Sequence, residues 1–211
     1  IEPFLVSIAK EIFAEVPDRT TLVFLPSIDT ARRLAVALQE CGMRADFVSG
    51  ACPDRHEKIA RFVSGETQVI CNAQLLTEGF DFDRINCVCV LRPTKIRSLY
   101  VQCVGRGTRP LTGLVDACSD AIERKAAIAA SAKPNLMILD FLWLTEKHQL
   151  IRPAHLVADR DEVAAKMLEA NNGEGDLLEG KEQADRDLLA ALEQSVREHA
   201  KKKRRNRRSD F

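Results

Sequence analysis

Two arginines in the stretch "YVQCVGRGTRP", residues 100–110, have side chains suited to binding a phosphate group. Arg106 and Arg109 are three positions apart, with Gly107 between them, directly after an apolar run. A guanidinium group stays charged in proteins and presents a planar fork of donors that matches phosphate oxygens. An isolated pair of this kind more often belongs to a solvated loop, so the rest of the chain must decide between the two interpretations.

Short apolar runs predict the sheet that would position these arginines. There are five of them, at 21–25, 44–48, 67–71, 85–91 and 136–141. Most are continuously apolar, which is typical of parallel strands covered on both faces. Helical patterns separate them: one helix is expected to use Asp29 as its N-cap, and another to open at Pro53 and end at Gly65. This alternation predicts an α/β three-layer sandwich with a mainly parallel sheet.

The second half of the chain is more polar. Residues 116–132 predict an inserted, mostly exposed helix. We expect the α/β domain to cover residues 1–158 and an acidic helical appendage to follow over 159–200. The basic tail, 201–211, contains "KKKRRNRR" and is expected to be disordered, with nucleic acid as its commonest kind of partner.

Composition restricts the compartment more than the function. Basic and acidic residues number 31 each, so the net charge indicates no partner. The seven cysteines form no C-x-x-C pair and the four histidines are scattered, so we expect no metal site. Cysteines used as small apolar residues suit a reducing compartment, and no apolar run reaches the ~18 residues of a membrane span. We therefore expect a cytoplasmic protein (nuclear only in a eukaryote) with no membrane partner. The chain also starts without Met and mid-pattern, so we expect it to be part of a longer protein.

Polar residues follow each of the first four predicted strands, and the arginine pair follows the helix after the fourth. In an open parallel sheet, ligands bind beyond the carboxyl ends of the strands. The sequence therefore predicts that all of these polar clusters, including the arginines, meet at that one edge.

Three consecutive stretches carry a family resemblance. "TLVFLPSIDTARRLAVAL", "DFVSGACPDRHEKIARFVSGETQVICNAQLLTEGFDFDRINCVCVLRPT" and "YVQCVGRGTRP" together resemble the motifs of the C-terminal RecA-like domain of superfamily 2 helicases, over about residues 20–145. The last stretch matches the pattern Q-x-x-G-R-x-x-R at Gln102, Gly105, Arg106 and Arg109. The "LTEGFD" and "RPT" forms are most similar to DNA-acting members related to restriction-type translocases and repair helicases, and less similar to RNA-acting DEAD-box enzymes.

The resemblance implies a RecA-like fold and a share in an ATP site. ATP with Mg²⁺ would lie between this lobe and an N-terminal RecA-like lobe of the same protein. That other lobe would hold most of the phosphates, because this sequence has neither a G-x-x-x-x-G-K-[ST] loop nor a DExx segment. Arg106 and Arg109 would be arginine fingers that reach the γ-phosphate, with Gln102 setting their position. The resemblance assigns ATP binding to Gly79, Asp81 and Gly105.

The resemblance also implies a nucleic-acid track that contacts phosphates without reading bases. Many relatives have Thr where this chain has Ala73, so that contact would move to Asn72 or Thr77. The matching positions are Ser27, Ser49, Gly50, Asn72, Thr77 and Thr94.

We therefore expect the second motor lobe of an ATP-dependent DNA helicase or translocase, with RNA a less favoured partner than DNA. One alternative is a non-catalytic nucleic-acid-binding module with a RecA-like fold. Binding alone needs no γ-phosphate sensor, so the presence of both arginines favours the motor. A Rossmann-type metabolic enzyme would need G-x-G-x-x-G after the first strand, where this chain has "FLPSID".

Overall fold

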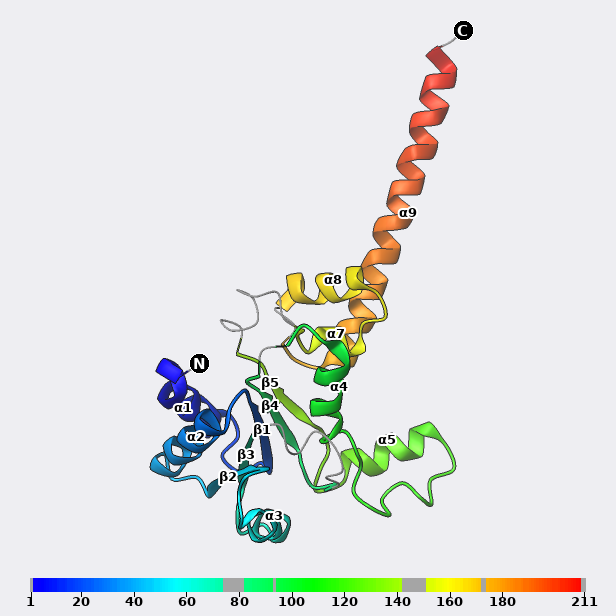
Figure 1. Ribbon diagram of the computed structural model, residues 1–211. Coiled ribbons are helices and arrows are strands. Elements are labelled where there is room, and N and C mark those ends of the chain that lie inside the picture. The colour runs from blue at the N-terminus through cyan, green and yellow to red at the C-terminus, as the bar shows by residue number, and fades with distance from the viewer. Residues whose placement is uncertain (1, 74–81, 93, 142–150, 172–173, 210–211) are drawn as a thin grey trace. The chain divides into compact units, whose positions relative to one another are not determined.

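The computed structural model describes residues 2–73, 82–92, 94–141, 151–171 and 174–209 (Figure 1). The chain divides into two compact units, residues 1–151 and 152–211. Each unit has its own buried core. None of the helices in the described ranges is long and apolar enough to cross a membrane.

The first unit is built on a parallel sheet. Its strands lie in the order β2-β3-β1-β4-β5, and every neighbouring pair is parallel. The predicted strands are confirmed, with ends shifted by a residue or two: β1 Thr21–Leu25, β2 Ala45–Ser49, β3 Val69–Ala73, β4 Cys87–Val90 and β5 Met137–Leu139. The central strands β1, β3 and β4 are buried throughout, whereas the edge strands β2 and β5 are partly exposed. The continuous apolar runs therefore belong to the strands that helices cover on both faces.

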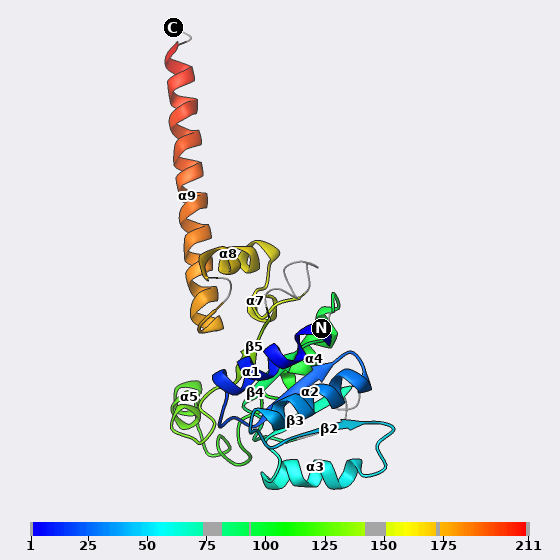
Figure 2. The same cartoon turned by 90° about the vertical axis from the view of Figure 1, so that its left-hand side faces the viewer.

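Helices cover both faces of this sheet and make it a three-layer sandwich, as Figures 1 and 2 show. The helices α1 and α2 lie on one face, and α4 lies on the other. Apolar residues of α1 and α2 form one buried cluster with residues of β1, β3 and β4. The helices of this unit are α1 Leu5–Glu15, α2 Ile28–Glu40, α3 Arg55–Ser64, α4 Arg97–Gly105 and α5 Ala121–Ala129, with a short 3-10 turn at Glu2–Phe4.

The start of α2 corrects one sequence prediction. Ser27, not Asp29, is the N-cap: its hydroxyl accepts from the Thr30 N–H at 3.2 Å, and the Thr30 hydroxyl accepts from the Ser27 N–H at 3.2 Å. This reciprocal pair satisfies two amide donors at once, which a cap at Asp29 would not do. Asp29 instead lies in the first turn, where a negative charge is favourable, and pairs with Arg32 at 2.7 Å.

The next helix begins two residues later than predicted: the sequence predicts that Pro53 opens it, whereas α3 starts at Arg55 with Asp54 as its N-cap. The second predicted helix, α3, ends at Gly65, whose φ of +83° is the left-handed conformation that glycine adopts most easily. The inserted helix α5 has no buried residue, as its Lys/Glu/Ala-rich sequence predicts.

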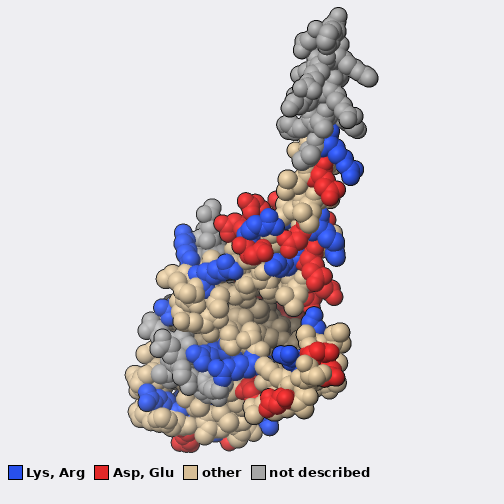
Figure 3. Space-filling view, turned by 90° about the vertical axis from the view of Figure 1, so that its right-hand side faces the viewer, with Lys and Arg blue, Asp and Glu red and all other residues tan. Residues whose placement is uncertain are grey.

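The second unit consists of α7 Ala154–Val157, α8 Asp161–Asn171 and α9 Leu177–Ser209. Its small core is formed by Ala154, Ala158, Val163, Ala164, Met167 and Ala184. Ala154 and Ala158 belong to this core, and the compact unit begins at Arg152. Figure 3 shows acidic and basic side chains interleaved over this unit. The backbone of residues 201–209 continues α9.

The edge strand β2 has its outward backbone groups occupied. In a parallel pair only alternate residues bond the neighbouring strand. The Arg44 carbonyl accepts from the Val69 N–H on β3, so Ala45 and Phe47 direct their backbone groups away from the sheet. Such free groups are a template on which another chain can add a strand.

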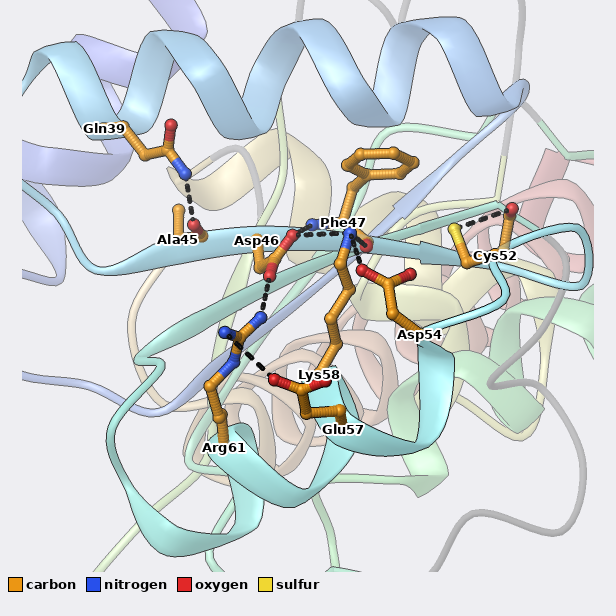
Figure 4. A network of polar contacts seen from close by, with 10 residues as sticks. Gln39, Ala45, Asp46, Phe47, Cys52, Asp54, Glu57, Lys58 and Arg61 are labelled. Carbon is orange, nitrogen blue, oxygen red and sulfur yellow. Dashed lines mark hydrogen bonds and ion pairs between the residues drawn. The ribbon is translucent and has the colours of Figure 1, made fainter.

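Side chains of the same unit bond these outward groups (Figure 4). Gln39 donates to the Ala45 carbonyl at 2.8 Å, and the Phe47 N–H donates to the Asp46 carboxylate at 2.7 Å. Lys58 donates to the Phe47 carbonyl at 3.2 Å and pairs with Asp46 at 3.1 Å. The Lys58 ammonium also lies 4.2 Å from the centre of the Phe47 ring. This edge is therefore closed by its own side chains.

Lys58→Ala should open the edge and weaken the fold. We expect the free energy of unfolding to fall by about 1–3 kcal/mol, because the Phe47 carbonyl and the Asp46 carboxylate each lose a partner. Urea unfolding measures this loss, and sedimentation should show concentration-dependent self-association. The matched control is Lys10→Ala on the exposed side of α1, which should change neither. If Lys58→Ala behaves like the control, the edge network contributes nothing to stability or to assembly.

Candidate functional site

The two arginines lie on a tight turn at the end of α4. The Arg106 N–H donates to the Cys103 carbonyl at 3.4 Å, and the Gly107 N–H donates to the Val104 carbonyl at 2.9 Å. The Thr108 hydroxyl closes the turn by donating to the Gly105 carbonyl at 3.0 Å. Arg106 is half-buried and Arg109 is exposed. Gln102, also exposed, lies one helical turn before Arg106.

The two glycines of this stretch have different surroundings. Gly107 is buried, and a Cβ added there would clash with the Leu136 side chain and lie 3.2 Å from Val88 Cγ2 on β4. A Cβ at Gly105 would meet no atom within 4 Å. Gly107 therefore allows the turn to pack against the sheet, whereas a side chain at Gly105 would extend into open space.

A lysine anchors the turn from a distant part of the chain. Lys133 Nζ donates to the Arg109 carbonyl and to the Asp83 carbonyl, at 2.6 Å each. The Asp83 carboxylate accepts from the Thr112 N–H at 2.6 Å and from the Thr112 hydroxyl at 2.7 Å. These two Thr112 donors lower the pKa of Asp83, the hydroxyl most strongly. Burial lowers the pKa of Lys133, and the Asp83 charge partly opposes that shift. We name the residues Asp83, Arg109, Thr112 and Lys133 the turn anchor.

Sequence reasoning missed Lys133. It lies 24 positions from Arg109, beyond the exposed insertion that contains α5. Both of its acceptors are backbone carbonyls. Every residue type has a carbonyl, so the sequence does not reveal these two bonds. Its place in "KPN", just before the fifth apolar run, is the only signal that the sequence offers.

The structure puts the arginine turn at the amino edge of the sheet. Asp83 precedes β4, and Lys133 and Leu136 precede β5, so the groups that contact the turn mark the strand beginnings. The prediction that every polar cluster meets at the carboxyl edge is therefore wrong for the arginines. The reason is that α4 is a crossover: it must carry the chain from the end of β4 back to the beginning of the next parallel strand. Residues after such a helix lie at the opposite edge from residues before it.

The described nucleic-acid candidates do share the carboxyl edge. Ser27 follows β1, Ser49 ends β2 and Gly50 follows it. Asn72 lies one residue before the end of β3, and Thr94 follows β4. Gly79, Asp81 and Thr77 lie outside the described residues. The structure therefore brings five of the six track candidates to one edge and the arginine turn to the other.

These five candidates differ in how they are presented. Ser27 and Gly50 are exposed. Ser49 is buried, with its Oγ 3.2 Å from Cys52 Sγ. Asn72 is fully buried and its amide donates to the Val23 carbonyl at 3.0 Å, while the Thr94 hydroxyl accepts from the Ile96 N–H at 3.0 Å. The side chains of Ser49, Asn72 and Thr94 are therefore buried, and their contacts hold the strand ends and turns of this edge in place.

No group of three or more His, Cys, Asp or Glu side chains that could hold a metal ion occurs in the described part of the chain. Both cysteines on β4, Cys87 and Cys89, are fully buried, and burial raises the pKa of the Cys87 thiol to about 11. These thiols pack as apolar groups.

The comparisons with known proteins identify the family. The family model for the helicase conserved C-terminal domain matches residues 5–110, half of the chain. This chain belongs to the helicase C-terminal domain family. The match ends at Pro110, so it includes Arg106 and Arg109 and stops before Thr112 and Lys133.

Two curated proteins are similar to part of the chain. The chain is 36% identical over 93 residues to the putative ATP-dependent helicase IRC3 of Saccharomyces cerevisiae, covering 43% of this chain and 14% of that protein. It is 27% identical over 97 residues to a 51.5 kDa protein of a Lactococcus phage, covering 45% of this chain and 22% of that protein. The chain thus spans less than a quarter of the length of either relative.

Two solved helicase structures align with part of the chain. The C-terminal domain of the DEAD-box protein Dbp5 aligns with 64% of this chain and 68% of its own length, with a TM-score of 0.47 and 15% identity. The Hef helicase domain of Pyrococcus furiosus aligns with 51% of this chain and 23% of its own, with a TM-score of 0.40 and 22% identity. The family match and the five-stranded parallel sheet covered by helices give this helicase C-terminal domain its RecA-like fold.

Proposed function

We propose that this helicase C-terminal domain is the second motor lobe of an ATP-dependent DNA helicase or translocase, and that Arg106 and Arg109 are its arginine fingers. The observation that carries the proposal is the arginine turn itself. Both guanidinium-bearing residues lie within one turn after α4, and the turn is held against the amino edge of the sheet through Gly107 and Lys133. A fixed backbone with long cationic side chains suits groups that must reach a phosphate on a facing lobe.

The residues of the turn fit an ATP site shared with another lobe. When bound, ATP with Mg²⁺ would supply the phosphoryl bond that is cleaved and the metal charge that neutralises its oxygens. In our proposal Arg106 and Arg109 donate to oxygens that gain negative charge in the transition state. Gln102 orients them from the preceding helical turn, and Gly105 leaves space for the nucleotide, together with Gly79 and Asp81. Most phosphate contacts would come from the N-terminal lobe, because this sequence contains no phosphate-binding loop.

We place the nucleic-acid track at the carboxyl edge. Ser27 and Gly50 are exposed there and can donate from hydroxyl or amide groups to phosphates, together with Thr77. Ser49, Asn72 and Thr94 would act by holding the strand ends and turns that carry those donors. The preference for DNA rests on the "LTEGFD" and "RPT" forms of the motifs. In this arrangement α4 and the strands would connect the nucleotide edge to the nucleic-acid edge.

The test is ATP turnover in the longer protein that carries both lobes. We expect residues 1–211 alone to show no turnover, because the groups that hold Mg²⁺ and most phosphates are missing. The two-lobe protein should hydrolyse ATP, with stronger stimulation by DNA than by RNA of matched length. Nucleic-acid binding without turnover in the two-lobe protein would instead support a non-catalytic binding module. Stronger stimulation by RNA would overturn the DNA assignment and leave the motor proposal standing.

A further inference from the structure

Lys133 is a buried lysine at the amino edge of the sheet, and lysine is among the residue types that are almost never fully buried. Only 6% of it is exposed, and its ammonium donates to two backbone carbonyls at 2.6 Å. Burying an ammonium group is costly, and the lowered pKa of Lys133 reflects this cost. An apolar side chain of similar length could fill the same volume, and such replacements of buried charges are often neutral for stability. The charge at this position therefore calls for a role other than packing.

The turn anchor joins segments that are far apart in the sequence. Lys133 lies just before β5, Arg109 lies on the arginine turn after α4, and Asp83 lies just before β4. The anchor also holds the stretch from Arg109 to Thr112 at both ends, one through Lys133 and the other through the Asp83 carboxylate. Three of these bonds, each with its two atoms 2.6 Å apart, involve a charged partner, and such hydrogen bonds are stronger than those between neutral groups. The arginine turn cannot shift relative to Asp83 without breaking these three bonds.

We infer that Lys133 is a positioning residue for the finger Arg109: it holds the backbone of Arg109 at a fixed distance from Asp83, just before β4. This inference rests on the proposed function. Lys133 acts through backbone carbonyls and does not itself touch the nucleotide. Because a displacement of about 1 Å in a reacting group can cost 10²-fold in rate, loss of this anchor should reduce turnover without removing the finger.

The test in the two-lobe protein is Lys133→Met, which keeps the length of the side chain and removes the donors. We expect kcat for ATP to fall by about 10–100-fold while KM changes by less than about twofold, since a finger acts mainly in the transition state. Lys133→Arg keeps charged donors and should recover part of kcat. The matched control is Lys125→Met on the exposed face of α5, which should leave kcat unchanged.

A double variant links the lysine to the finger. In an Arg109→Ala background, Lys133→Met should lower kcat by less than about twofold, because the group that it positions is already gone. An undiminished loss in that background would show that Lys133 acts on something else, and would overturn the inference. If Arg109→Ala alone keeps its turnover, the proposed finger role fails.

Hydrogen exchange of residues 1–211 tests the anchor without any nucleotide. Lys133→Met should speed exchange of the Thr112 amide about tenfold or more, whereas Lys125→Met should not. Unchanged Thr112 exchange would show that Lys133 does not hold the turn, whatever the outcome for the fingers. If Lys133→Met fails to fold, Lys133→Gln is the second variant, because its shorter side chain cannot reach both carbonyls at once. A kcat within twofold of the parent for Lys133→Gln would then overturn the inference, and a several-fold fall would support it.

Discussion

Alanine at Arg106 or at Arg109 is expected to lower ATP turnover by about 10³–10⁵-fold in the protein that joins this lobe to its N-terminal partner. The loss should appear in kcat, with little change in the affinity for ATP or nucleic acid. The reason is that a finger stabilises charge that develops only in the transition state. Lysine at either position should restore little, because an ammonium on a flexible stem does not reproduce the planar fork of donors. The two losses should not add, since both residues serve one phosphate.

Steady-state hydrolysis with saturating nucleic acid measures this effect. Arg124→Ala is the matched control, because Arg124 is an exposed arginine on α5 outside the turn. It should keep the turnover of the parent. A structural role for the two arginines predicts a lowered melting temperature and partial rescue by lysine. Turnover within a few-fold of the parent in both alanine variants would remove the finger assignment.

Removing the basic charges of residues 201–211 is expected to abolish most of the salt dependence of nucleic-acid binding. The segment contains seven Lys and Arg residues. Seven charges that neutralise single-strand phosphates give a slope of log K against log salt of up to about −5. The parent chain should therefore lose about 10³ in affinity between 50 and 200 mM salt, and the truncated chain much less than that.

Fluorescence anisotropy with labelled single-stranded DNA at several salt concentrations measures the slope. A variant with glutamine at all seven positions keeps the length of α9 and separates charge from truncation. Glutamine at Arg124 and Lys125, two exposed positions on α5, is the matched control and should leave the slope near that of the parent. If truncation leaves the slope unchanged, the tail does not bind phosphates.

Much of the fold could be predicted because each signal is local. Continuous apolar runs such as 21–25 and 67–71 identify buried parallel strands, and Gly65 identifies a helix end. The cap of α2 was harder, since both Ser27 and Asp29 are residue types that cap helices. What decides between them is the reciprocal bond with Thr30, which depends on backbone geometry.

The site could be predicted only in part. The arginine pair is visible because its residues are neighbours in one motif. Its edge of the sheet was assigned wrongly, because the rule that ligands bind at the carboxyl ends ignores the return of the chain along α4. Lys133 was missed because its acceptors are the carbonyls of Asp83 and Arg109, and any residue type provides a carbonyl. Contacts to the backbone across a long insertion require coordinates.

The most direct test of the finger assignment is complementation between separate lobes. Residues 1–211 would be mixed with the separately prepared N-terminal lobe, and ATP turnover measured with saturating DNA. We predict that the parent chain restores turnover, whereas the Arg106→Ala chain binds the other lobe and DNA with similar affinity and restores at most about one thousandth of it. Equal turnover with the parent and the Arg106→Ala chain would contradict the account, as would hydrolysis by residues 1–211 alone.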